Sequence, residues 1–249
     1  MIQYHEQHSP PPNLPPGGNL QSRLKYFLRI SLDLMISSVL RHLHPWLSTK
    51  SGTILEVGCG LQPYRHLIPD NCTYQGLDWE KADQVFDYMA PNTIYYDGLK
   101  FPFPNNEFES LFHTEVLEHI YNTNLFLSEC NRVLKNNGLL FFSVPFQARY
   151  HYIPNDYWRF TPASLEIILR NSGFNNIKII NRGTDITVAA YKVLSIIYRW
   201  LRGNLFEKFL GFISIPVGVF LLIIGHCTER WEIGSRDDSL GYCIICQKN

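Results

Sequence analysis

The chain has 249 residues, of which 45% are apolar, so it can bury the core of one α/β domain with additions or of two small domains. Lys plus Arg and Asp plus Glu both number 22, and this balance argues against a nucleic-acid-binding protein, which needs a cationic excess. The six cysteines have neither zinc-site spacing nor the density of a disulfide scaffold, which favours reduced thiols and a cytoplasmic location.

Two segments precede the first strand pattern. Residues 1–18 form a polar, Pro-rich arm that does not read as a secretory signal and is expected to be flexible. Residues 19–50 carry apolar side chains at helical spacing from Leu20 to Leu47, with most basic residues elsewhere on the helix. We expect one cap helix here, acting as a lid over a ligand site.

Two glycines follow the first apolar strand, which begins at Ile54 and ends in Glu56 and Val57. The loop Gly58-Cys59-Gly60 would let the backbone approach a ligand closely. Pro63 stands where a dinucleotide fingerprint has its third glycine, and no Gly-Lys-Ser/Thr follows as in a Walker loop. A carboxylate at Glu56 would repel phosphate but suits a ligand with ammonium and sulfonium charges, such as S-adenosylmethionine.

The segments that follow support this interpretation. Asp78 ends a second strand about 20 residues after the glycine loop, where related folds place the acid that binds both ribose hydroxyls. Next come Asp97-Gly98 before a Phe-Pro-Phe turn, a strand at 110–113, Val-Leu-Glu-His at 116–119, Arg-Val-Leu-Lys-x-x-Gly at 132–138 and a strand at 139–144.

In this order the segments resemble the class I S-adenosylmethionine-dependent methyltransferases, type 11 branch, over roughly residues 51–181 and a last strand at 240–247. The resemblance implies an α/β fold with a Rossmann-like seven-stranded sheet, an N-terminal helix and a helical insertion before the last strand. Gln62 replaces the third glycine that is usual in the family's loop. The residues expected to bind the cofactor are Glu56, Gly58, Cys59, Gly60, Asp78, Trp79, Asp97, Gly98, Thr114 and Glu115.

The expected domain organisation separates the α/β core at 51–181 from an insertion at 182–239, before the last core strand at 240–249. In the insertion, 17 residues from Phe209 to Gly225 carry no charge, and as a helix they would extend roughly 25 Å, less than the ~30 Å hydrocarbon core. Two main alternatives stay open for this segment: a buried cap over a substrate pocket, or contact with a membrane surface.

The loop after the fifth strand, residues 145–160, is rich in aromatic and charged side chains. Methyl transfer from a sulfonium needs alignment, and a base only when the acceptor is protonated. His151 is the first candidate base, with Asp156 available to orient it, and His119 is the second. The expected substrate-binding residues are Arg149, Asp156, Tyr157 and Arg159, the arginines for an anionic group, although Arg159 could instead pair with Asp156.

No metal site is expected. Cys243 and Cys246 read as C-x-x-C, but three residues apart on a strand they point to opposite faces. His113 is expected to be a hydrogen-bonded core residue.

These features predict a methyltransferase that modifies a hydroxyl of a small or lipid-linked acceptor, such as a surface-glycan precursor or a secondary metabolite. C-methylation of a polyprenyl quinone and a catalytically silent cofactor-binding module are the alternatives.

Overall fold

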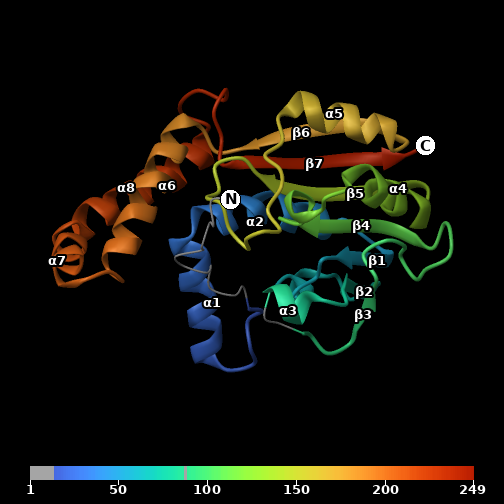
Figure 1. Cartoon of the computed structure of the whole chain (residues 1–249), viewed down its shortest axis with the longest axis horizontal. Helices are drawn as coiled ribbons and strands as arrows, with labels where there is room; N and C mark the ends of the chain where they lie inside the picture. The colour runs from blue at the N-terminus through green and yellow to red at the C-terminus, as the bar shows by residue number, and fades with distance from the viewer. Residues whose placement is uncertain (1–13, 87–88) are drawn as a thin grey trace.

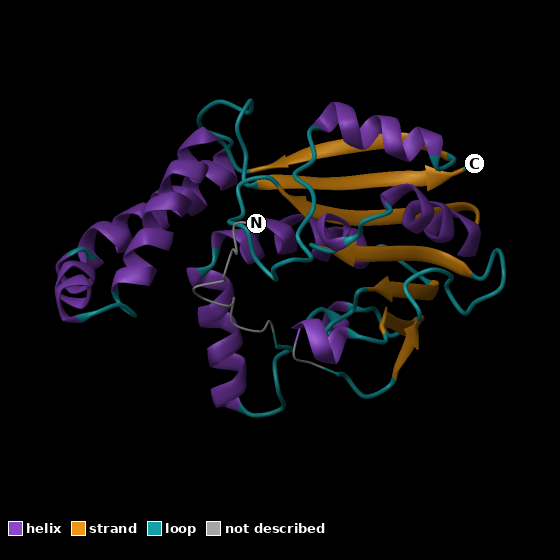
Figure 2. Ribbon diagram, viewed as in Figure 1, coloured by secondary structure: helices purple, strands orange, loops and turns teal. Residues whose placement is uncertain are grey.

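The computed structural model describes residues 14–86 and 89–249, so most of the predicted arm at 1–18 lies outside the described residues. One seven-stranded sheet has helices on both faces, and a helical arm extends beyond it (Figures 1 and 2). The strands are β1 (Gly52–Val57), β2 (Cys72–Trp79), β3 (Thr93–Tyr96), β4 (Phe108–Thr114), β5 (Leu134–Pro145), β6 (Phe174–Arg182) and β7 (Gly241–Lys248). The helices are α1 (Leu20–Leu32), α2 (Leu34–Leu47), α3 (Ala82–Phe86), α4 (Thr123–Val133), α5 (Pro162–Asn171), α6 (Asp185–Trp200), α7 (Leu205–Ile213) and α8 (Ile215–Trp231), with short 3-10 helices η1 (Arg65–Leu67) and η2 (Leu117–His119).

The strand order is β3-β2-β1-β4-β5-β7-β6, which confirms the predicted Rossmann-like methyltransferase sheet. The first five strands in this order pair in parallel, and β7 runs antiparallel to both β5 and β6. The carboxyl ends of β1, β2, β4 and β5 therefore share one edge, where open α/β sheets bind ligands.

Two hydrophobic cores lie on opposite faces of the sheet. Helices α4 and α5 bury one face, and α2 buries the other. Successive residues of β5 alternate between them, with Phe141 in the α2 core and Phe142 in the α4–α5 core. Cys243 and Cys246 are divided in the same way, which confirms that they cannot ligate one metal ion.

The predicted single helix from Leu20 to Leu47 is wrong, because the chain breaks at Asp33. Its backbone is extended, with φ −114° and ψ 99°, and its carboxylate caps α2 by accepting from the backbone N–H of Met35 and Ile36. Helix α1 contains no fully buried residue. It packs through Tyr26, whose ring lies edge-on to His66 of η1 with centroids 5.0 Å apart. This contact places α1 beside the segment that follows the glycine loop.

His113 lies in the core as predicted, but the expected hydrogen bonds are absent from the described structure. Its ring stacks on Phe142 at 4.7 Å and meets the edge of Phe126 at 5.2 Å, and neither ring nitrogen has a hydrogen-bond partner among the described residues. Burial lowers the pKa of His113 to about 3, so the imidazole is neutral. It acts as an aromatic packing residue.

The predicted insertion starts one residue later than expected, because β6 includes Arg182. Helices α6 and α8 pack along each other, and α7 joins them at the end of the arm farthest from the sheet (Figure 1).

Candidate functional site

The glycine loop leaves β1 with a backbone that only glycine adopts easily. Gly58 and Gly60 have φ of 65° and 53°. A Cβ at Gly58 would lie 2.5 Å from Cγ2 of Val116, so glycine is also required by the close approach of the segment after β4. The Gly60 N–H donates to Asp78 Oδ2 at 2.8 Å, which joins the loop to the end of β2.

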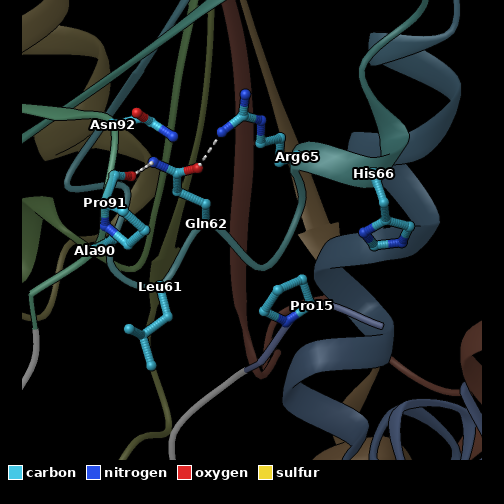
Figure 3. A pocket seen from close by; sticks show the side chains of 8 residues that line it. All are labelled: Pro15, Leu61, Gln62, Arg65, His66, Ala90, Pro91 and Asn92. Atoms are coloured by element: carbon cyan, nitrogen blue, oxygen red, sulfur yellow. Dashed lines mark hydrogen bonds between the residues drawn. The ribbon is translucent and has the colours of Figure 1, made fainter. Parts of the chain in front are cut away.

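Gln62 replaces the family's third glycine. Its backbone adopts the left-handed conformation, with φ of 55°, so the turn is preserved without a glycine. Its side chain donates to Thr93 Oγ1 at 2.9 Å. It also accepts from Arg65 at 2.9 Å (Figure 3). These bonds tie the loop to β3 and η1, so the substitution preserves the local path of the backbone.

A hollow of about 490 Å³ adjoins this turn (Figure 3). Its lining residues are Pro15, Leu61, Gln62, Arg65, His66, Ala90, Pro91 and Asn92. None of the carboxylates expected to bind the cofactor lines it, so it is a neighbouring space and not the predicted ribose site.

Glu56 is buried at the end of β1, where its carboxyl group accepts a hydrogen bond from the Tyr74 hydroxyl. Burial raises the pKa of Glu56 to about 8, and the nearby Asp78 charge adds to this increase, while the Tyr74 bond opposes it. Near neutral pH the group therefore holds a proton that a nearby cation would displace.

Glu56→Gln should change how stability depends on pH. Between the ordinary carboxyl pKa of 4.5 and about 8, folded protein keeps a proton on Glu56 that unfolded chain releases, so wild type loses stability as pH rises through this window. The variant cannot ionise there and should lose less. Urea unfolding of both proteins at pH 5 and pH 8 measures the difference, and equal losses would show that Glu56 ionises normally in the folded state.

Four predicted cofactor residues lie at the carboxyl ends of β2 and β3, as the two pairs Asp78–Trp79 and Asp97–Gly98. Asp78 is buried, and its Oδ1 accepts from the Trp79 N–H at 2.8 Å. A Cβ on Gly98 would lie 3.1 Å from Nε1 of Trp79, so the indole packs directly against the glycine. Asp97 is exposed, and its Oδ1 accepts from the backbone N–H of Leu99 at 2.8 Å, which fixes this turn at the end of β3.

Glu115, expected to contact the cofactor, forms a different interaction in the structure. Its Oε1 lies 3.0 Å from Nη2 of Arg182 and accepts from Ser143 Oγ at 2.7 Å. Arg182 is fully buried and also donates to the Val144 carbonyl at 3.0 Å. Thr114 precedes Glu115 at the end of β4, at the edge where the cofactor was predicted.

Arg182 and Tyr74 are site residues that the sequence prediction missed. Arg182 was assigned to the start of the insertion, and its one available signal is its position between an apolar strand and Gly183. Tyr74 lies within β2 and showed no special pattern. Both hold acidic residues that were predicted to face a ligand.

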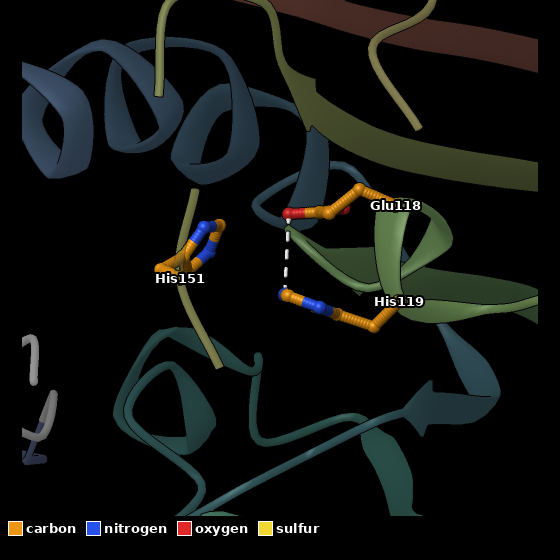
Figure 4. Close-up of side chains that lie close together, drawn as sticks. All are labelled: Glu118, His119 and His151. Carbon is orange, nitrogen blue, oxygen red and sulfur yellow. Dashed lines mark ion pairs between the residues drawn. The ribbon is translucent and has the colours of Figure 1, made fainter. Parts of the chain in front are cut away.

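The two candidate bases lie together beside Glu118 (Figure 4). The rings of His119 and His151 meet edge to face with centroids 4.9 Å apart. Nδ1 of His151 lies 3.0 Å from Oδ2 of Asp156 and 2.9 Å from the Arg149 carbonyl, so as a donor it points to both oxygens. The predicted orientation of His151 by Asp156 therefore has matching geometry.

His119 has a more enclosed environment. Its Nδ1 lies 2.6 Å from the Asn155 carbonyl, and its Nε2 lies 3.7 Å from Oε1 of Glu118. Burial lowers the pKa of His119 to about 4 and raises the pKa of the fully buried Glu118 well above its usual range. His119 is consequently a weak base at neutral pH.

Asp156 connects the predicted substrate residues. Burial alone would raise its pKa, but hydrogen bonds from Arg159 and His151 outweigh this effect and hold the pKa well below its usual range. The Arg159 contacts, at 2.6 and 2.7 Å, show that this arginine does pair with Asp156. Arg149 and Tyr157 are exposed in the same loop, and the Tyr157 hydroxyl donates to Asn155.

A second hollow, of about 260 Å³, opens beside this loop and is lined by Ala148, Tyr150, Asp156, Tyr157, Trp158 and Arg159. It contains three of the four predicted substrate residues. Neither histidine lines it, so it is a candidate recognition surface beside the reacting groups.

Among residues 14–86 and 89–249, Glu118, His119 and His151 form the one group of acidic, histidine or cysteine side chains whose ligand atoms, within 4.8 Å of one another, could reach a common metal ion. Two ligands about 2.1 Å from a tetrahedral ion lie roughly 3.4 Å apart. The 3.7 Å between Glu118 and His119 is close to this spacing, and the Asp156 contact at Nδ1 of His151 leaves Nε2 as the nitrogen of that ring that would face an ion.

Comparison with known proteins identifies the central part of the chain. A family described as "Methyltransferase domain" matches residues 55–142, from the glycine-loop strand to β5. No curated protein sequence matches the chain.

Solved structures share the fold at low sequence identity. A SAM-dependent methyltransferase from Archaeoglobus fulgidus aligns with a TM-score of 0.53 and 17% identity, covering 90% of this chain and 99% of that one. Phosphoethanolamine N-methyltransferase 2 from Haemonchus contortus, solved with phosphomonomethylethanolamine and S-adenosylhomocysteine, aligns with a TM-score of 0.52 and 17% identity, covering 91% of this chain but only 58% of its own. The [4+2]-cyclase SpnF aligns with a TM-score of 0.51 and 18% identity, covering 86% and 81% of the two chains.

Proposed function

This chain belongs to the class I S-adenosylmethionine-dependent methyltransferases, and we propose that it methylates a hydroxyl group of a small or lipid-linked acceptor with His151 as the general base. The observation that carries the proposal is the His151–Asp156 contact of 3.0 Å beside His119, at the carboxyl edge of the sheet. In the Ser-His-Asp triad, a histidine oriented by a buried carboxylate is the general base that takes the proton from a hydroxyl.

The residues of the edge suit the family's cofactor. S-adenosylmethionine supplies a methyl group on a positively charged sulfonium and carries ribose hydroxyls but no phosphate. Asp78 is positioned to accept from hydroxyl groups, Trp79 and Gly98 offer a flat surface for an aromatic base, and the proton on Glu56 can leave when a cation approaches. The glycine loop completes this set, because it allows close backbone contact.

Asp78→Ala should weaken S-adenosylmethionine binding by about 1.5–3 kcal/mol, because a charge-assisted hydrogen-bond acceptor is lost. Isothermal titration calorimetry measures the change, with thermal unfolding as a check because Asp78 also holds the Gly60 N–H. Asp70→Ala is the matched control, since this exposed acid lies at the opposite end of β2. Unchanged affinity in Asp78→Ala would show that this residue does not bind the cofactor.

His151 is preferred to His119 as the base for two physical reasons. His119 is made a weak base by burial, with a pKa of about 4. His151 instead has a carboxylate on Nδ1, which fixes the ring and stabilises the positive charge that develops when Nε2 takes a proton. The proton then resides on His151 until it is released to water.

An acceptor hydroxyl suits this chemistry, because a neutral alcohol is a weak nucleophile until a base takes its proton, whereas a neutral amine attacks through its lone pair. Arg149 and the hollow beside Asp156 supply cationic and aromatic groups for an acceptor with an anionic substituent such as a diphosphate. Incubating the enzyme with methyl-labelled S-adenosylmethionine and fractionated cell extracts, then identifying the labelled product by mass spectrometry, tests the assignment. A labelled ether supports it, and a methylated quinone carbon contradicts it.

A further inference from the structure

The outer part of the helical arm carries a dense group of exposed apolar side chains, which we call the arm tip. Leu205 is 87% exposed, and Phe206, Phe212 and Phe220 are each more than 60% exposed. The exposed apolar residues of the tip are Leu205, Phe206, Phe209, Phe212, Ile213, Ile215, Val217, Val219, Phe220 and Ile223. A soluble surface rarely gathers this many large apolar groups without a partner.

The base of the arm is held firmly while the tip extends away from the sheet (Figure 2). Near the base, Glu229 of α8 pairs with Arg41 of α2 at 3.0 Å, and His226 contacts the Ser31 carbonyl at 2.8 Å. Gly225 allows close packing, since a Cβ there would lie 2.6 Å from the Leu34 side chain. The exposed tip is therefore presented by an anchored element, and its exposure favours the membrane-contact alternative over the buried cap.

Among the described residues no single helix is long and apolar enough to cross a bilayer. Helices α7 and α8 reach that length and hydropathy only together, and they are bent by 56° at the break between them. A bent apolar pair at the end of an arm suits insertion into one leaflet, where a helix lies near the headgroups and buries its apolar side.

The charges around the tip indicate which kind of membrane surface it would bind. Between residues 199 and 225 the chain has three cations, Arg199, Arg202 and Lys208, and one acid, Glu207. Glu207 is engaged in capping α7, since it accepts from the Asn204 N–H at 2.7 Å. All three cations are exposed, so the apolar tip has a cationic border that matches anionic headgroups.

Helix α1 offers a second surface of the same character. Its exposed apolar residues, spaced along one side, are Leu20, Leu24, Phe27, Leu28 and Leu32. The exposed cations Arg23 and Lys25 lie on the same helix. In Figure 1, α1 and the arm both extend from the edge to which the parallel strands point.

We propose that the arm tip inserts into one leaflet of an anionic membrane, with α1 as a second contact, and so holds the methyltransferase domain at the lipid surface. A second copy of this chain is the main competing occupant. A symmetric pairing of two tips would bring the same three cations together, which disfavours it. Binding to lipid requires no methyl acceptor, so its test stands apart from the proposed function.

Flotation of the full-length protein with vesicles tests the proposal. Wild type should float with phosphatidylcholine vesicles containing 30% phosphatidylglycerol and much less with phosphatidylcholine alone. Phe212→Glu/Phe220→Glu should abolish flotation. Arg199→Gln/Arg202→Gln/Lys208→Gln should weaken it by about fivefold for each cation removed. Ile167→Glu, an equally exposed site on α5, is the matched control and should float as wild type does.

A second measurement keeps the test decisive if the double variant misfolds. Phe209→Trp adds a sixth tryptophan, in the otherwise intact tip, and brominated lipids should quench a larger share of its fluorescence than of wild type's if the tip enters the leaflet. Folded wild type that stays soluble with both vesicle types, or a Phe209→Trp that is quenched no more than wild type, would overturn the proposal. A dimer in light scattering that the tip substitutions dissociate would also overturn it and assign the surface to a second copy.

Discussion

Replacing His151 by alanine should lower the turnover number by about 10²–10⁴-fold, the usual contribution of a positioned general base. S-adenosylmethionine affinity should change little, because His151 lies in the loop after β5 and not on the glycine-loop side of the edge. Methyl transfer to the identified acceptor and calorimetry with the cofactor give the two quantities.

Two further variants separate catalysis from loop structure. Asp156→Asn keeps the shape of the carboxylate but not its charge, so it should lower turnover less than loss of His151 does. His119→Ala should have a smaller effect still, because the imidazole is a weak base. Wild-type turnover in His151→Ala would rule out the assigned base, and a comparable loss confined to His119→Ala would move the role there.

Glu115→Ala should destabilise the protein by roughly 1–3 kcal/mol, because it leaves the fully buried Arg182 guanidinium without its carboxylate partner, although the Glu115 side chain itself is 32% exposed. Urea unfolding measures this loss. Glu115→Ala/Arg182→Met should be less destabilised than Glu115→Ala alone, since the orphaned charge is then removed. Glu166→Ala breaks an exposed pair with Arg170 and should change stability by no more than about 1 kcal/mol.

The Glu115→Ala variant distinguishes two roles for Glu115 when cofactor affinity is measured beside unfolding. If Glu115 acts mainly through Arg182, the variant protein should be less stable but should keep its cofactor affinity while it is folded. Weaker cofactor binding with unchanged unfolding free energy would instead support the contact predicted from the sequence.

The sheet and the glycine loop could be predicted because their signals are local. Gly58 and Gly60 must occupy backbone regions that other residues avoid, and Asp78 follows its strand at a fixed spacing. The opposite burial of Cys243 and Cys246 follows from the two-residue period of a strand.

Other features depend on contacts that the sequence does not show. The apolar spacing from Leu20 to Leu47 continues through Asp33, so it predicts one helix. The Asp33 carboxylate instead caps α2 and ends α1, which the spacing does not reveal. The pairing of Glu115 with Arg182 joins residues distant in the chain, which no local pattern reveals. Whether the Phe209–Gly225 segment would be covered or exposed depended on the direction in which the anchored arm extends, and that is set by tertiary packing.

The most direct test of the central claim is transfer of label from methyl-labelled S-adenosylmethionine into cell extract by the purified protein, with His151→Ala beside it. We predict that wild type labels one extractable hydroxyl compound and that the variant, although it binds the cofactor equally well, labels it at least about 100-fold more slowly. Cofactor binding without transfer of label to any fraction would contradict the claim and identify the protein as a silent binding module.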